Sequence, residues 1–288
     1  MNSIEKAVEQ ARESGQLEGL GSVEARGSDA QKMVPVRMGR GRNQIDQRIE
    51  SSRAIANMRE SKVLDKRELD RRLIIHPDTG HNKVVESFRQ IRTTITKQAQ
   101  GANAVIMVTS VVGNGGNSFV ALNLGAAFAL DTGKTALVID CNLRNPFLTQ
   151  LVLDEDGQGL VDYLENENID VDKIIHAIGI ERLRVVPAGG KRESTSEYFT
   201  SEKVKNFLEG VKSRYVERYI ILDAPPVEES ADAQILSDLA DYVLLVVPYG
   251  RVTKVQLDAA VKALDKRKLL GVIFNDVPNI PQKFKARA

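Results

Sequence analysis

The chain has 288 residues, of which 42% are hydrophobic and 27% are charged, and its formal net charge at pH 7 is +1. This balance is typical of a globular protein with one large domain and appendages, and it gives no indication of a nucleic-acid partner. The single cysteine excludes an internal disulfide, and no apolar run approaches the ~18 residues of a membrane-spanning helix. The first residues also lack the basic and then apolar layout of a signal peptide.

The N-terminal region, 1–74, is expected to form a short helix and a basic, flexible linker. Ser3 is a suitable N-cap for a helix over 3–13, whose apolar residues share one face. Glycines then interrupt all periodicity over 14–45. The stretch 36–72 carries eleven Lys and Arg against six Asp and Glu. It fits a solvated linker or, as a second interpretation, a surface for an anionic membrane or an acidic partner.

Between residues 75 and 280, short apolar runs alternate with helical patterns, and 281–288 remain as a short tail. A helix is predicted over 83–97, with an apolar face formed by Val84, Phe88, Ile91 and Ile95. Strands are predicted at 104–109, 135–140, 183–187, 219–223, 242–248 and 269–274, and helices at 118–130, 159–178, 200–214, 229–240 and 253–266. Runs that are apolar on both faces and alternate with helices predict a doubly wound, mostly parallel sheet.

A glycine-rich stretch, SVVGNGGNSFVALNLG (110–125), joins the first of these strands to its helix. Such a turn can aim several backbone N–H groups and a helix N-terminus at one phosphate. Ser118 stands where the hydroxyl of a Walker A loop would meet Mg²⁺. The full pattern is not matched, because Asn117 replaces its lysine and Val111 its first glycine. A tight turn without a ligand is the alternative.

Two carboxylates favour the nucleotide interpretation. Asp140 ends the strand TALVID and Asp223 ends the strand YIILD, so both are expected at the sheet edge that carries the loop. A buried aspartate without a partner loses its hydration, and a metal–phosphate group would compensate for that loss. Either aspartate alone also fits the cap of a following turn or helix.

Several further motifs together resemble those of the bacterial tyrosine kinases, the P-loop autokinases of capsule and exopolysaccharide synthesis. VIDCNLRNP (138–146) is similar to their second acidic motif, Walker A′, and YIILDAPPV (219–227) to their Walker B strand. Glu86, Arg89 and Arg92 match their E-x-x-R-x-x-R helix motif. Shorter matches lie at 123–125, 159–164, 185–190 and 271–275. The resemblance covers roughly 75–280 in order, and the opening helix and linker resemble the stand-alone members.

The resemblance implies a P-loop NTPase fold and a role for each matched residue. The nucleotide, ATP or ADP with Mg²⁺, would contact Gly113, Asn114, Gly115, Gly116, Asn117, Ser118, Phe119 and Asn275. Ser118, Asp140 and Asp223 would organise the metal. Asp140, Asn142, Arg144 and Asp223 would form the catalytic set.

The resemblance also implies partners. Glu86, Arg89 and Arg92 would pair across subunits of a homo-oligomeric ring, and their spacing does place them on one helix face. A membrane-bound polysaccharide co-polymerase or adaptor is the expected partner. The protein is expected in the cytoplasm, recruited to the inner face of the cell membrane by that partner or by its basic linker.

The chain departs from the family pattern at three places. Asn117 removes the main cation at the β- and γ-phosphates, and neutral hydrogen bonds are roughly half as strong as charge-assisted ones. Asn142 replaces the second acid of Walker A′. All six tyrosines lie at or before Tyr249, so the tail lacks the usual tyrosine cluster.

These losses favour a weakly active or inactive nucleotide-binding regulator or scaffold of exopolysaccharide export. An active tyrosine autokinase or ATPase with unusual residues is the first alternative. A positioning ATPase of the ParA/MinD type is the second, although that class carries an early lysine where this loop has Val111 and Val112.

Overall fold

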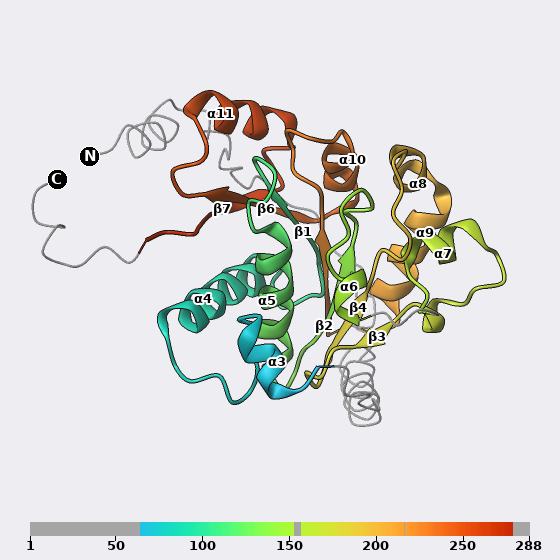
Figure 1. Ribbon diagram of the computed structural model, residues 1–288, viewed down its shortest axis with the longest axis horizontal. Coiled ribbons are helices and arrows are strands. Elements are labelled where there is room, and N and C mark those ends of the chain that lie inside the picture. The colour runs from blue at the N-terminus through green and yellow to red at the C-terminus, as the bar shows by residue number, and fades with distance from the viewer. Residues whose placement is uncertain (1–63, 153–156, 216, 279–288) are drawn as a thin grey trace, which may run out of the picture. The chain divides into compact units, whose positions relative to one another are not determined.

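The computed structural model describes residues 64–152, 157–215 and 217–278 (Figure 1). In chain order the elements are α3 (Lys66–Arg71), α4 (Lys83–Gln98), β1 (Val105–Ser110), α5 (Asn117–Ala129), β2 (Thr135–Asp140), α6 (Thr149–Val152), α7 (Leu160–Glu165), η1 (Val171–Lys173), β3 (His176–Ala177), β4 (Leu183–Val186), α8 (Ser196–Thr200), α9 (Glu202–Ser213), β5 (Arg218–Asp223), α10 (Asp232–Leu239), β6 (Tyr242–Pro248), α11 (Lys254–Ala263) and β7 (Leu269–Asn275). The predicted helix 3–13, the linker 14–45 and the tail 281–288 lie outside the described residues.

The strands form one sheet in the order β3-β4-β2-β5-β1-β6-β7. The short strand β3 pairs antiparallel with β4, and all other pairs are parallel. β1, β2 and β5 are buried along their whole length, as their continuous apolar sequences predict. The doubly wound, mostly parallel sheet expected from the sequence is therefore confirmed.

Alternate residues of the strands contribute to two cores, one on each face of the sheet. On one face, Ile106 and Val138 pack with helices α4 and α5; on the other, Met107 and Leu137 pack with α9 and α10. Figure 1 shows α3, α4 and α5 grouped together, apart from α7 to α10. Gly125 allows α5 to pack closely on the sheet, because a Cβ atom there would lie 2.5 Å from Cγ2 of Val138.

Three local predictions differ from the structure. The buried face of α4 begins at Val85, whereas Val84 is 51% exposed, so the predicted stripe was wrong at its first residue. The predicted helix 159–178 is broken into α7, η1 and β3. Leu64 and Leu69, upstream of the expected domain start at residue 75, already belong to the core. Helix α3 has no long apolar period that the sequence could reveal, because it spans fewer than two turns.

Candidate functional site

The candidate site lies at the carboxyl edge of the parallel sheet, where three central strands end. β1 continues into the glycine-rich loop 111–116 and then into α5, while β2 and β5 end at Asp140 and Asp223. These two aspartates are partners in the register of β2 with β5, and Asp223 is also in register with Val108 of β1. The loop and both carboxylates, which the sequence placed at one edge, thus lie side by side.

Close contacts require glycine in this loop. Asn114 and Gly116 adopt left-handed backbone conformations, with φ of 53° and 90°. A Cβ atom at Gly116 would lie 2.0 Å from Nδ2 of Asn275, and one at Gly115 would lie 2.5 Å from Cβ of Ser110. Gly116 is also the N-cap of α5, so the loop brings the positive end of that helix dipole to the site.

Side chains from two other connections hold the outer side of the loop. Arg251, between β6 and α11, donates to the carbonyl oxygens of Gly113 and Asn114, both at 2.9 Å. Asn275, at the end of β7, donates through Nδ2 to the carbonyl oxygen of Gly115 at 3.1 Å. The C=O and N–H of a trans peptide point in opposite directions, so the following N–H groups face away from these side chains. Successive N–H groups aimed to one side are the geometry that binds phosphate.

Asn117, at the position of the family's lysine, is buried and bound within the chain. Its Nδ2 donates to Oδ1 of Asp223 at 2.9 Å and to the carbonyl oxygen of Ala224 at 2.9 Å. Its Oδ1 accepts from Oγ of Ser110 at 3.2 Å. Asn117 is only 6% exposed, and its side chain forms hydrogen bonds with three polar groups at the sheet edge. Asn117 therefore joins the loop to the strand end of β5 and adds no positive charge to the site.

The paired aspartates share a low-dielectric environment. Burial raises the pKa of Asp140 to about 7. Burial, followed by repulsion from Asp140, raises the pKa of Asp223 well above its usual value, although the nearby side chains of Ser118 and Asn117 oppose this shift. At neutral pH the two carboxyl groups therefore hold more protons than they would in the unfolded chain.

Asp140 organises the loop that follows β2. Its Oδ1 accepts from the N–H of Asn142 at 3.1 Å, and its Oδ2 accepts from the N–H groups of Phe147 and Leu148 at 2.9 and 2.8 Å. Asp140 is fully buried, and neither it nor Asp223 lines the pocket described next. The capping interpretation that the sequence left open therefore describes the observed contacts of Asp140.

A pocket of about 530 Å³ opens over the loop. Its lining residues are Gly113, Asn114, Gly116, Asn117, Ser118, Phe119, Asn142, Asn145, Phe147, Pro226 and Glu229. Glu229 is the one charged residue among these described lining residues, and its Oε1 lies 2.1 Å from where a Cβ atom of Gly113 would be. The described lining residues thus include no cation, and the N-terminus of α5 brings the positive end of a helix dipole to the pocket.

The other predicted site residues lie apart from the pocket. Arg144 is exposed in the loop after β2, and Asn275 touches the loop from outside. On α4, Arg89 approaches Glu86 at 3.9 Å, with both side chains about half exposed. Arg92 donates to the carbonyl oxygen of Ala127 at 2.9 Å and so fastens α4 to α5 within the chain.

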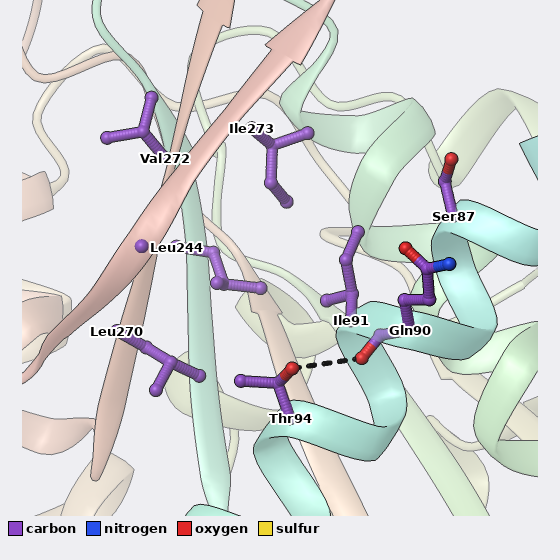
Figure 2. Close-up of a pocket in the computed structure, with 9 residues that line it drawn as sticks. Ser87, Gln90, Ile91, Thr94, Leu244, Leu270, Val272 and Ile273 are labelled. Carbon is purple, nitrogen blue, oxygen red and sulfur yellow. Dashed lines mark hydrogen bonds between the residues drawn. The ribbon is translucent and has the colours of Figure 1, made fainter. Parts of the chain in front are cut away.

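A second hollow of about 330 Å³ lies between α4 and the edge strand β7 (Figure 2). Ile91 from α4 faces Leu244 and Ile273 across it, and Oγ1 of Thr94 donates to the carbonyl oxygen of Gln90 at 3.1 Å. Its lining residues carry no charge and lie away from the strand ends. Its polar side chains, Ser87, Gln90 and Thr94, all come from α4, and no glycine-rich loop or helix N-terminus lines it, so we place the candidate site at the loop.

The sequence did not identify Arg251 or Glu229 as site residues. Neither lies in a motif, and each approaches the loop from a connection more than a hundred residues downstream. A signal was nonetheless present for Glu229, because an acidic pair follows the Pro-Pro exit of β5.

The donor set fits a nucleotide phosphate and is poor for Mg²⁺. Ser118 lines the pocket, and Oδ2 of Asp223 is a buried oxygen without a hydrogen-bond partner in the part of the chain that the structure describes. Oδ1 of Asp223, however, is held by Asn117. Across the described ranges, no group of three or more His, Cys, Asp or Glu side chains converges as a metal site.

No family model matches this sequence. The chain is 33% identical over 193 residues to the tyrosine-protein kinase YwqD of Bacillus subtilis (strain 168), and the match covers 66% of this chain and 80% of YwqD. It is also 29% identical over 209 residues to the succinoglycan biosynthesis transport protein ExoP of Rhizobium meliloti (strain 1021). That match covers 69% of this chain but 25% of ExoP, so the chain spans about a quarter of that relative's length.

A solved structure is similar over most of the described residues. The BceF tyrosine kinase domain superposes with a TM-score of 0.60 and 26% identity, covering 82% of this chain and 90% of that domain. The similarity of sequence and of fold thus points to the same group of proteins as the motifs.

Proposed function

We propose, because the chain belongs to the bacterial tyrosine kinase family, that it binds a nucleotide as a regulator or scaffold of exopolysaccharide and capsule biosynthesis and export and has little or no kinase activity. This proposal rests mainly on the side chain of Asn117, which is hydrogen-bonded within the chain and is not available as a cation for phosphate. The loop keeps its shape and its N–H groups, while the residue at the lysine position is a buried amide paired with Asp223.

The proposed ligand is ATP or ADP. Its phosphates would meet the N–H groups of the loop and the N-terminus of α5, with the hydroxyl of Ser118 beside them. Mg²⁺, where present, would draw on the hydroxyl of Ser118, because Asp223 does not line the pocket. When bound, Mg²⁺-ATP supplies a transferable phosphoryl group, and transfer depends on cancelling charge around that group.

Two features of the pocket oppose such transfer. Asn117 provides no cation for the β- and γ-phosphates, and Glu229 adds a negative charge beside Gly113. Without a lining cation, no side chain cancels the charge that spreads over the transferred phosphoryl group in the transition state. These features support the regulator over an active autokinase.

The proposed partner is a membrane-bound polysaccharide co-polymerase or adaptor, because the name of the relative ExoP refers to biosynthesis and transport of succinoglycan. No helix within the described residues is long and apolar enough to cross a membrane. We propose that such a partner recruits the chain to the cytoplasmic face of the membrane. The half-exposed Glu86 and Arg89 of α4 are proposed to act in self-assembly.

Titration calorimetry with ADP tests the nucleotide proposal. We expect saturable binding to the wild-type chain that depends on the phosphates, so that adenosine binds at least about tenfold more weakly than ADP. The titration is repeated with and without Mg²⁺, and we expect only a small difference because Oδ1 of Asp223 is occupied by Asn117. Absence of ADP binding at millimolar concentration would refute the proposed function.

A further inference from the structure

Arg251 extends from a connection that is fastened at both ends. Before it, the N–H of Tyr249 donates to the carbonyl oxygen of Asn275 at 2.8 Å, which ties this connection to the end of β7. After it, Thr253 caps α11 together with Gln256. Nε2 of Gln256 donates in turn to the carboxylate of Glu228 at 3.1 and 3.3 Å, which links α11 to the connection after β5.

The guanidinium group of Arg251 fits the loop as a two-pronged donor. Nη2 and Nη1 donate to the adjacent carbonyl oxygens of Gly113 and Asn114 at 2.9 Å each. A planar fork can hold two acceptors in fixed geometry, whereas an ammonium group acts as a single charge. These bonds are charge-assisted and are therefore stronger than the neutral bond from Asn275 to the next carbonyl.

A cation that binds these carbonyl oxygens also affects the N–H groups at the opposite ends of the same peptide units. The carbonyl of Gly113 and the N–H of Asn114 belong to one peptide unit, and the carbonyl of Asn114 shares a unit with the N–H of Gly115. Hydrogen bonds in a chain polarise one another, so a positive charge at the oxygen end strengthens the N–H as a donor. Arg251 thus affects both the direction and the strength of the donors that would meet a phosphate.

We propose that Arg251 is the positioning residue of the phosphate loop: it holds Gly113 and Asn114 in the anion-binding conformation and supplies through the peptides the positive charge that Asn117 does not. The inference rests on the proposed nucleotide function. The connection between β6 and α11 would thus provide the positive charge that a lysine provides in a complete Walker A loop. Because Arg251 is exposed, its replacement should leave the fold intact.

The test compares Arg251→Ala, Arg251→Lys and the control Arg267→Ala. Arg267 is also an exposed arginine, but it pairs with Asp265 at 2.8 Å near the amino end of β7, at the opposite edge of the sheet. Two quantities are measured for each chain: the affinity for ADP by calorimetry, and the amide hydrogen exchange of residues 113–116 in the ligand-free protein.

We expect Arg251→Ala to weaken ADP binding by about tenfold and to speed exchange in the loop by a similar factor. Arg251→Lys should recover part of both effects, and Arg267→Ala should match the wild type. Equal affinity and equal exchange in Arg251→Ala and wild type would overturn the inference. If the wild type binds no ADP, the proposed function fails, and exchange alone decides: faster loop exchange in Arg251→Ala supports the positioning role, and unchanged exchange refutes it.

Discussion

Replacing Asn117 with lysine is expected to raise the affinity for ADP by about 10- to 100-fold. The loop, α5 and the bonds of Arg251 and Asn275 already present the cradle that a lysine would complete. One charge-assisted hydrogen bond to a phosphate contributes about 1.5–3 kcal/mol, which corresponds to this range. Calorimetric titration of the wild-type and variant chains with ADP measures the gain.

Asn117→Met is the matched control, because methionine has nearly the length of lysine and lacks its charge. Both substitutions release Asp223 and Ala224 from the amide of Asn117, so the difference between them isolates the charge. The gain in Asn117→Lys should also shrink at high salt. If Asn117→Lys binds ADP no more tightly than Asn117→Met, the cradle around position 117 is not intact.

The free energy of unfolding of the wild-type chain is expected to fall as the pH rises from about 5 to about 8. Unfolded aspartate titrates near its model value of 3.8, whereas burial raises the pKa of Asp140 to about 7 and that of Asp223 well above 3.8. In this window the folded chain therefore holds more protons than the unfolded chain, and rising pH favours unfolding. The raised pKa of Asp140 corresponds to a loss of about 2–4 kcal/mol. Urea denaturation at several pH values measures it.

Asp223→Asn should reduce this slope by about half or more and should make the chain more stable than wild type at pH 8. The amide keeps an acceptor for Nδ2 of Asn117, and its NH₂ group replaces an oxygen that has no partner among the described residues. Asp265→Asn is the control: the bond to Arg267 lowers the pKa of this partly exposed carboxyl to about 2, below the window. A wild-type chain that is more stable at pH 8 than at pH 5 would contradict the shifts.

The sheet was largely predictable because its central strands are buried on both faces. β2 and β6 begin and end where the apolar runs do, at Thr135–Asp140 and Tyr242–Pro248. Helix α4 was located correctly, but its inward face was misjudged at Val84, because the adjacent Val85 has the same side chain. When two neighbouring positions are equally hydrophobic, the sequence pattern does not show which of them faces the core.

The contacts of the site were much less predictable. The sequence identified Asn117 as a missing charge, but not as the partner of Asp223 and Ala224, since that contact depends on the rotamer of one buried side chain. Arg251 and Glu229 reach the loop through tertiary packing, which leaves no local spacing in the sequence. Motifs predicted where the site lies, and only the fold showed which charges surround it.

We infer that the loop retains a nucleotide cradle while phosphoryl transfer has been lost. The intact mass of the full-length chain tests this inference, after incubation with Mg²⁺-ATP at a concentration that saturates the site in the ADP titration. We expect an unchanged mass, because Asn117 leaves the pocket without a lining cation and Glu229 adds a negative charge. Stoichiometric addition of phosphate to a tyrosine would refute the loss of phosphoryl transfer and identify the chain as an active autokinase.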